Sequence, residues 1–394
     1  MSKIYLDHAA TTAVHPEVLE AMLPYYTQEF YNPSTGYHAG RDIKDKIEEI
    51  REYIASCIHA FPDEIYYTSG GTEGDNWILD TSCRNGRDLI SDVGNYRPVH
   101  IITSCIEHHA ILNTCKELEN RGEEVSYLPV DSHGRIRITD LQNEIRRETG
   151  LVSIQYANNE IGTIQPVNQI GDLCRKYEIP FHTDAVQACG HIPINVQEMN
   201  IHSLSASAHK FRGPKGVGFL YVRRSVPLHS YIHGGSQERG FRAGTENVPG
   251  IIGMGKALEL AYQDMEIRSR NEQRLRDYFI RRILREIPDS RINGHMLYRL
   301  SNNINLAFRY VNGSSLLILL DDDEIYVSAG SACNSDHSGP SHVIRALHLP
   351  ETYENGVLRI TIGEENTVEE LDQVIRLLKY HVEELRAAAP ELHS

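Results

Sequence analysis

Short apolar runs alternate with amphipathic stretches through the first two thirds of this 394-residue chain. The runs are expected to form strands at Ile65–Thr68, His100–Thr103, Val125–Pro129, Val152–Tyr156, Pro180–Thr183, Ser203–Ser207 and Val217–Val222. Helices are expected between them, for example at Ala110–Arg121 and Val167–Tyr177. This alternation predicts an α/β layer architecture with a largely parallel sheet.

The last third of the chain has a different pattern. Residues 251–285 are expected to form one long helix that leads to a second unit. Beyond it, strands are expected at Asn303–Phe308 and Val357–Ile362, and helices at Ser341–Leu347 and Val368–Leu385. We therefore expect a large domain over residues 16–260. A smaller α+β domain would combine residues 1–15 with 261–394 and carry a loop at about 328–340.

Charge, hydropathy and cysteine content narrow the function classes. The formal net charge of -15 argues against nucleic acid as a main partner, because phosphate backbones repel such a surface. The sequence contains no run of about 18 apolar residues, so no transmembrane helix is expected. Met1–Asp7 lacks the apolar core of a signal peptide, so a cytoplasmic location is expected. The seven cysteines form no CxxC pair, which predicts reduced thiols and no metal site.

Four segments contain residue types that packing explains poorly. The first, Thr68–Asn76, follows an expected strand and opens an expected helix. Its glycines let the backbone approach a ligand, and the helix start offers free N–H groups to a phosphate. Thr72 could add a hydroxyl. The alternative is an ordinary tight turn between strand and helix.

Asp184 and Lys210 follow two further expected strands. A carboxylate at the C-terminal end of a strand can pair with a protonated heterocyclic nitrogen, although a helix N-cap aspartate is the simpler interpretation. Lys210 lies among small residues, where loss of water lowers the pKa of an amine and makes it a nucleophile that forms a Schiff base. The alternative is a solvated loop lysine.

Cys333 lies in a small, polar, glycine-containing loop, Val327–Pro340. An exposed cysteine of this kind is a poor core residue and a good nucleophile. The other six cysteines fall in strand or helix contexts, where a buried, inert thiol is expected. The four segments together supply a phosphate cradle, a carboxylate, an imine-forming lysine and a thiol. Pyridoxal phosphate requires the first three, so the residues alone indicate a pyridoxal-phosphate enzyme with a reactive thiol.

Ordered motifs extend this interpretation along nearly the whole chain. They are Tyr5–Thr12, Asn32–Ser34, Glu107–His108, Asn158–Gly162, His182–Gln187, Ala208–Lys210, Gly234–Gly240, Arg242–Asn247, Gly330–Cys333, Pro340–Leu347 and Leu358–Gly363. In these motifs the chain resembles the cysteine desulfurases of the NifS/IscS type, within the class V aminotransferase group.

The resemblance implies an aminotransferase-like fold of type I that binds pyridoxal 5'-phosphate. Lys210 would hold the cofactor and move protons, and Asp184 would pair with its ring nitrogen. His108 would stack on the ring and act as an acid or base. Gln187 and Asn159 would bond near the ring hydroxyl. Four residues would hold the phosphate, namely Gly71, Thr72, Ser207 and His209.

The resemblance also implies a substrate and partners. Arg359 and Asn32 would bind the carboxylate of L-cysteine, and Cys333 would receive its sulfur as a persulfide for acceptor or scaffold proteins. Thr245 would reach the phosphate in a neighbouring subunit, which implies a homodimer. Iron–sulfur cluster assembly or related sulfur transfer is the expected pathway.

Other functions stay open at this stage. A selenocysteine lyase would fit the same pocket, and a transaminase would not require Cys333. A non-catalytic scaffold that docks sulfur carriers would require neither Cys333 nor Lys210. The chain departs from the usual family pattern at Gly74, at Asn334–His337 and at Glu364–Glu365. Residues 84–98 are expected to form an inserted surface loop.

Overall fold

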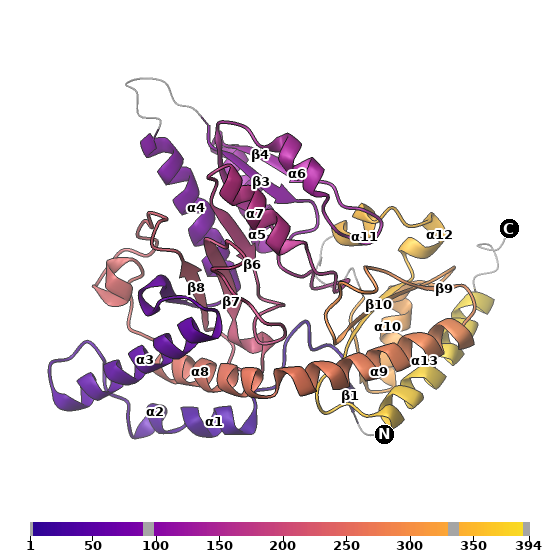
Figure 1. Cartoon of the computed structure of the whole chain (residues 1–394). Coiled ribbons are helices and arrows are strands. Elements are labelled where there is room, and N and C mark those ends of the chain that lie inside the picture. Colours follow the sequence, from indigo (N-terminus) through magenta and orange to yellow (C-terminus); the bar gives the residue numbers. More distant parts are fainter. Residues whose placement is uncertain (1–2, 90–97, 330–338, 389–394) are drawn as a thin grey trace.

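The computed structural model describes residues 3–89, 98–329 and 339–388, which form two packed units (Figure 1). The strands are β1 (Ile4–Tyr5), β2 (Ile65–Thr68), β3 (His100–Ser104), β4 (Glu124–Leu128), β5 (Thr149–Ser153), β6 (Phe181–Asp184), β7 (Ser203–Ser207), β8 (Gly218–Val222), β9 (Ser290–Ile292), β10 (Asn303–Phe308), β11 (Ile325–Tyr326) and β12 (Val357–Thr361).

The α-helices are α1 (Pro16–Met22), α2 (Pro24–Thr27), α3 (His38–Cys57), α4 (Gly71–Leu89), α5 (His109–Asn120), α6 (Ile138–Glu144), α7 (Val167–Lys176), α8 (Val248–Gln263), α9 (Met265–Glu286), α10 (Gly313–Asp322), α11 (His342–Ala346), α12 (Glu351–Glu354) and α13 (Val368–Ala388). Short 3-10 turns are η1 (Pro62–Glu64), η2 (Ala208–Lys210) and η3 (Gln237–Gly240).

A seven-stranded sheet forms the centre of the first unit, in the order β2-β8-β7-β6-β5-β3-β4. Strand β8 runs antiparallel to both of its neighbours, and the remaining strand pairs are parallel. The ends of β5, β6 and β7 therefore lie along one edge, where ligands bind in sheets of this class.

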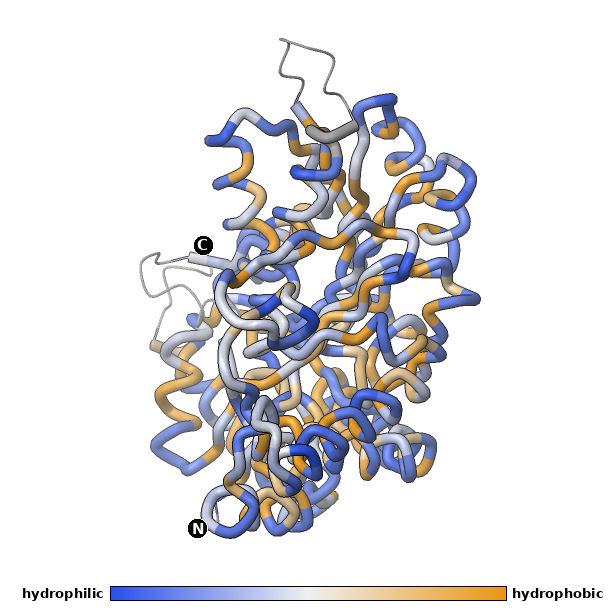
Figure 2. Tube along the Cα trace, turned by 90° about the vertical axis from the view of Figure 1, so that its left-hand side faces the viewer, coloured by the Kyte–Doolittle hydropathy of each residue, from blue (hydrophilic) through white to orange (hydrophobic). Residues whose placement is uncertain are grey.

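Successive residues of the inner strands face opposite sides of the sheet. Ile101 and Leu151 pack under α4 and α5, whereas Ile102 and Val152 join the larger core that includes α3, α7 and α8. Burial on both sides explains why these strands are almost continuously apolar. Along the outer helices, hydrophilic and hydrophobic residues alternate, as Figure 2 shows.

The second unit contains the antiparallel sheet β12-β10-β9, covered by α9, α10 and α13. The start of the chain belongs to this packing, because β1 pairs in parallel with β11, and Ile4 and Leu6 are buried in the same core. The domain boundaries expected from the sequence stay a prediction.

Two local predictions are wrong. Residues 251–285 form α8 and α9 with a break at Asp264, not one helix. At this break the guanidinium of Arg268 donates to the carbonyl of Ala261 at 3.0 Å and so caps the end of α8. The loop expected over residues 84–98 is wrong for residues 84–89, because α4 continues to Leu89, and residues 90–97 lie outside the described residues.

Strand β5 ends three residues earlier than the predicted Val152–Tyr156. Ile154 and Tyr156 still donate backbone hydrogen bonds toward the β6 side, to the carbonyls of His182 and Asp184 at 3.1 and 2.8 Å. The neighbouring strand β3 has already ended at Ser104. The backbone that follows β5 is therefore hydrogen-bonded to β6 but no longer to β3.

Candidate active site

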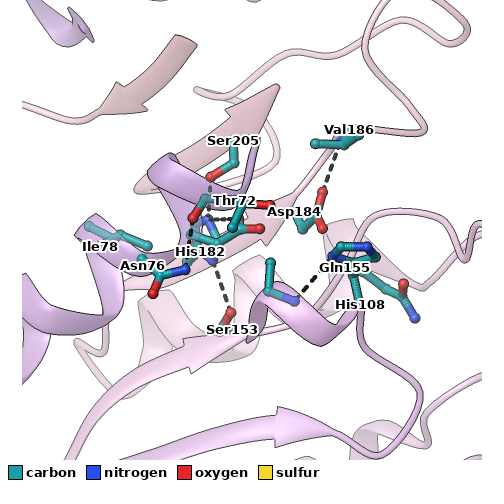
Figure 3. A network of polar contacts seen from close by, with 12 residues as sticks. Thr72, Asn76, Ile78, His108, Ser153, Gln155, His182, Asp184, Val186 and Ser205 are labelled. Atoms are coloured by element: carbon teal, nitrogen blue, oxygen red, sulfur yellow. Dashed lines mark hydrogen bonds and ion pairs between the residues drawn. The ribbon is translucent and has the colours of Figure 1, made fainter. Parts of the chain in front are cut away.

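Asp184 is the last residue of β6 and is almost completely buried. One oxygen, Oδ1, accepts a hydrogen bond from the backbone N–H of Val186 at 2.9 Å (Figure 3). Burial raises the pKa of Asp184, while His108, the Val186 N–H and Lys210 lower it. A buried carboxyl group thus lies close to Lys210 and His108, where it could bind a positively charged ring nitrogen.

His108 caps the N-terminus of α5. Its Nδ1 accepts a hydrogen bond from the backbone N–H of Ala110 at 3.1 Å. Because Nδ1 is an acceptor, a neutral imidazole would carry its proton on Nε2. Helix α5 therefore sets both the orientation and the tautomer of this ring, which lies near Asp184 in Figure 3.

Lys210 ends the turn η2, directly after the small residues of β7. Its Nζ donates to the carbonyls of Ala9 and Ala10 at 2.6 and 2.8 Å. Gln187 donates to the carbonyl of Ala9 at 3.1 Å, and the backbone carbonyl of Lys210 is bonded to His191 at 2.9 Å. The N-terminal segment therefore positions the lysine, a role that the sequence argument did not assign to it.

The turn between β2 and α4 lies beside the same strand ends. A side chain on Gly71 would place its Cβ 2.3 Å from a methyl of Val186, and one on Gly70 would contact the Ser207 hydroxyl at 3.4 Å. At Gly71 the backbone can approach Val186 this closely because the residue has no Cβ, and Gly70 adopts a φ of +154° that L side chains rarely take. His209 is bonded to Thr11 at 3.1 Å, and burial lowers its pKa to about 4, so it is neutral at pH 7.

A buried polar network lies beneath Asp184 (Figure 3). His182, two residues earlier on β6, is bonded to the hydroxyls of Ser153 at 2.9 Å and Ser205 at 3.1 Å. Burial lowers the pKa of His182 to about 3, so the ring is neutral. The carboxyl group of Asp75 on α4 lies 3.6 Å from this ring, and burial followed by the charge of Asp184 raises the pKa of Asp75.

Arg359 lies on β12 and its side chain is 5% exposed. Its Nη2 pairs with the Asp7 carboxylate at 2.7 Å, and its Nη1 donates to the backbone carbonyl of Asn159 at 3.3 Å. The third donor, Nε, is buried without a hydrogen-bond partner. An unpaired guanidinium N–H in such a place is suited to a carboxylate ligand. Asp7 was missed as a site residue, although it belongs to the Tyr5–Thr12 motif.

Two expected site residues lie apart from this cluster. Asn32 is exposed, and its side chain accepts a bond from the backbone N–H of Ser34 at 2.9 Å. Thr245 is also exposed and lines a small cavity with Thr68 and Ser69 that does not include Lys210. The roles predicted for both residues stay predictions.

Cys333 lies outside the described residues, but the chain on both sides of its segment is placed. Ser328 exchanges backbone hydrogen bonds with Arg359, at 3.1 and 2.6 Å. On the other side, the Ser341 hydroxyl donates to the buried carboxyl group of Glu160 at 2.6 Å. The described chain that precedes this segment thus lies beside Arg359.

Three of the other thiols are poor nucleophiles because of their surroundings. Burial raises the pKa of Cys57 to about 11, and the pKa values of Cys115 and Cys174 to about 12. A raised pKa leaves little thiolate at pH 7. Within residues 3–89, 98–329 and 339–388, no group of three or more His, Cys, Asp or Glu side chains could hold a metal, and no helix is long and apolar enough to cross a membrane.

Comparison with known proteins identifies the family. Residues 4–374 match the family model described as aminotransferase class-V. A protein of Methanosarcina thermophila named cysteine desulfurase IscS is 49% identical over 387 residues, which cover 98% of this chain and 94% of that protein. The chain belongs to the cysteine desulfurases of the class-V aminotransferase family.

Further relatives agree with this assignment. A cysteine desulfurase IscS of Dictyoglomus turgidum is 48% identical over 98% of this chain and 96% of its own length. A solved structure titled NifS-like protein has a TM-score of 0.89 at 36% identity, covering 97% of this chain and all (100%) of that one. Another, titled SspA in complex with cysteine, has a TM-score of 0.81 at 35% identity, covering 93% and 100%. The resemblance and the fold class inferred from the sequence are confirmed.

Proposed function

We propose that this desulfurase removes sulfur from L-cysteine with pyridoxal 5'-phosphate held on Lys210, and passes it through Cys333. The observation that carries the proposal is the convergence of Lys210, Asp184 and His108 at the ends of β6, β7 and the loop before α5. Pyridoxal phosphate, when bound, would act as an electron sink for bonds at the α-carbon of an amino acid.

The residues present fit this cofactor. Asp184 would hold the protonated ring nitrogen, because its carboxyl group is buried at the end of β6 close to His108 and Lys210. His108 would cover the ring, with its tautomer set by α5. Asn159 and Gln187 would bind near the ring hydroxyl. The phosphate would be held by four residues around the β2–α4 turn and the end of β7, namely Gly71, Thr72, Ser207 and His209.

Arg359 would bind the α-carboxylate of the substrate through its unpaired Nε, and Asn32 would assist. Lys210 would take and return protons at the α-carbon, because the carbonyl oxygens of Ala9 and Ala10 fix the position of its Nζ. The Cys333 thiolate would attack the substrate sulfur. One carbon–sulfur bond breaks and one sulfur–sulfur bond forms, so L-cysteine and the thiol become L-alanine and a persulfide.

A homodimer and sulfur acceptors complete the proposal. Apolar side chains at the surface around α1 and α2 are unusually exposed, namely Leu19, Leu23, Tyr26 and Phe30 at 49–64%. A patch of this kind favours burial against another subunit. Thr245 would then reach the phosphate of that subunit, and acceptor proteins of iron–sulfur assembly or related pathways would take the persulfide.

The test uses the full chain loaded with pyridoxal phosphate, supplied with L-cysteine and a reductant. We expect equal amounts of sulfide and alanine from the unchanged protein and from the control Cys57→Ala. Cys333→Ala should retain the cofactor spectrum and lose sulfide release, and Lys210→Ala should lose both. Sulfide release that is equal with and without Cys333 would contradict the role of this thiol. A wild-type chain that acts on selenocysteine alone would identify a lyase instead.

A further inference from the structure

One N-terminal turn, Asp7–Ala10, contacts both cationic side chains of the site. The turn is closed by a hydrogen bond from the Ala10 N–H to the Asp7 carbonyl at 2.9 Å. Its carbonyls at Ala9 and Ala10 accept from Lys210, and its carboxylate at Asp7 pairs with Arg359. The turn therefore places a carboxylate and two carbonyl dipoles next to Lys210 and Arg359, the two groups that would bind and react with an amino acid.

The pairing of Arg359 before any substrate binds has an electrostatic consequence. Its charge is already compensated by Asp7 at 2.7 Å, in a place where the arginine side chain is 5% exposed. A substrate carboxylate at Nε would share one guanidinium with the Asp7 carboxylate. Two negative charges on one cation repel each other, and little water is present to screen them.

The nearby acidic residues Glu364 and Glu365 pair with other side chains rather than with Arg359. Glu365 lies 3.7 Å from His8, and Glu364 pairs with Arg212 at 3.2 Å. In the described part of the chain, Asp7 supplies the carboxylate that is in hydrogen-bond contact with Arg359. Removing a charge at Glu365 is therefore a matched control for removing one at Asp7.

We propose that Asp7 is a positioning residue that orients Arg359 and, by its charge, weakens the binding of amino-acid carboxylates there. The inference rests on the proposed function and deepens it. Substrate and product carry the same α-carboxylate, so the repulsion acts on both equally. Such uniform weakening raises KM and speeds release of alanine without adding to the barrier of the chemical step.

The variant Asp7→Asn tests this idea. The amide keeps an oxygen that can accept from Nη2, so the guanidinium stays oriented while the negative charge is lost. We expect KM for L-cysteine and the dissociation constant of L-alanine to fall together, roughly threefold to tenfold for the loss of one nearby charge. KM is measured by alanine formation, and alanine binding is measured by isothermal titration calorimetry on the cofactor-loaded chain.

Glu365→Gln should leave KM for L-cysteine and the dissociation constant of L-alanine within about twofold of the wild type, because the carboxylate of Glu365 lies next to His8 and does not contact Arg359. If Asp7→Asn raises or leaves unchanged both constants, the charge of Asp7 does not weaken binding and the proposal is wrong. The calorimetric measurement requires no turnover. A wild-type chain that binds alanine but releases no sulfide would therefore refute the proposed function while still testing Asp7.

Discussion

A buried ion pair between α3 and η3 offers the sharpest stability test. Arg51 and Glu238 are 5% and 7% exposed, and their guanidinium and carboxylate form two parallel hydrogen bonds at 2.8 and 2.9 Å. Glu238 also accepts from the backbone N–H of Tyr67 at 2.9 Å. Three donors thus converge on one carboxylate, so Glu238→Gln would point an NH₂ group at a donor. It would also leave Arg51 with only the half-exposed Glu48, at 3.0 Å, as a counter-charge among the described residues.

Removing one partner of a buried pair costs about 3–5 kcal/mol of unfolding free energy. With an unfolding entropy of about 2.1 cal/mol/K per residue, a 394-residue chain that unfolds as one unit loses about 4–6 °C of Tm. Thermal unfolding is followed by circular dichroism and by the fluorescence of Trp77, the single tryptophan, which is fully buried.

The matched control is Asp63→Asn. Asp63 also pairs with an arginine, Arg224, through two hydrogen bonds, but the two side chains are 52% and 55% exposed. Exposed pairs contribute about 0–1 kcal/mol, so Tm should change by about 1 °C or less. Equal changes of Tm in Glu238→Gln and Asp63→Asn would refute the argument that burial, rather than pairing itself, sets the cost.

Three further outcomes are expected. Burial raises the pKa of Glu160 to about 7. The protonated carboxyl group favours the folded state fully below the unfolded pKa of about 4.3, and this stabilisation, up to about 3–4 kcal/mol, is lost as pH rises through the folded pKa, so Glu160→Gln should flatten the fall in urea stability between about pH 4 and 7. Gly218→Ala would place a Cβ 2.3 Å from the Ala206 carbonyl and 2.8 Å from Gly70; it should cost about 1–3 kcal/mol and weaken cofactor binding, and unchanged cofactor absorbance on titration would contradict this. Arg359→Lys should raise KM for L-cysteine roughly 10–100-fold, because an ammonium cannot donate hydrogen bonds to Asp7, Asn159 and a substrate carboxylate in one plane. An unchanged KM would show that Arg359 does not bind the substrate.

Most of the large sheet could be predicted from the sequence because each strand is a short apolar run with both faces buried. Ile65–Thr68 and Ser203–Ser207 were predicted with the observed ends. The break at Asp264 could not be predicted in this way, because the apolar spacing continues through it and the residue that caps α8 is Arg268, in the following helix.

Candidate site residues at strand ends could likewise be predicted from the local sequence, because Asp184 and Lys210 each follow a recognisable strand. The role of Asp7 at the site could not be predicted, because it depends on a contact with Arg359, 352 residues away in the sequence. Neither the charge of Asp7 nor its place near the start of the chain distinguishes it from a surface aspartate. The tertiary pairing of β1 with β11, together with the bridge between Asp7 and Thr361, places it at the site.

The same distance has a consequence for how the chain is made. Strand β1 can pair only after Ile325 and Tyr326 of β11 have been synthesised, and Asp7 can meet Arg359 only later still. At about 5–20 residues per second, the first residues wait tens of seconds for their partners. The large unit can fold during that time, and the turn that holds Lys210 can pack on it, because the N–H groups of Thr12 and His15 donate to the carbonyls of His209 and Arg212. The contact of Asp7 with Arg359 forms later. An incomplete chain therefore carries a lysine and a carboxylate in place without a finished catalytic centre.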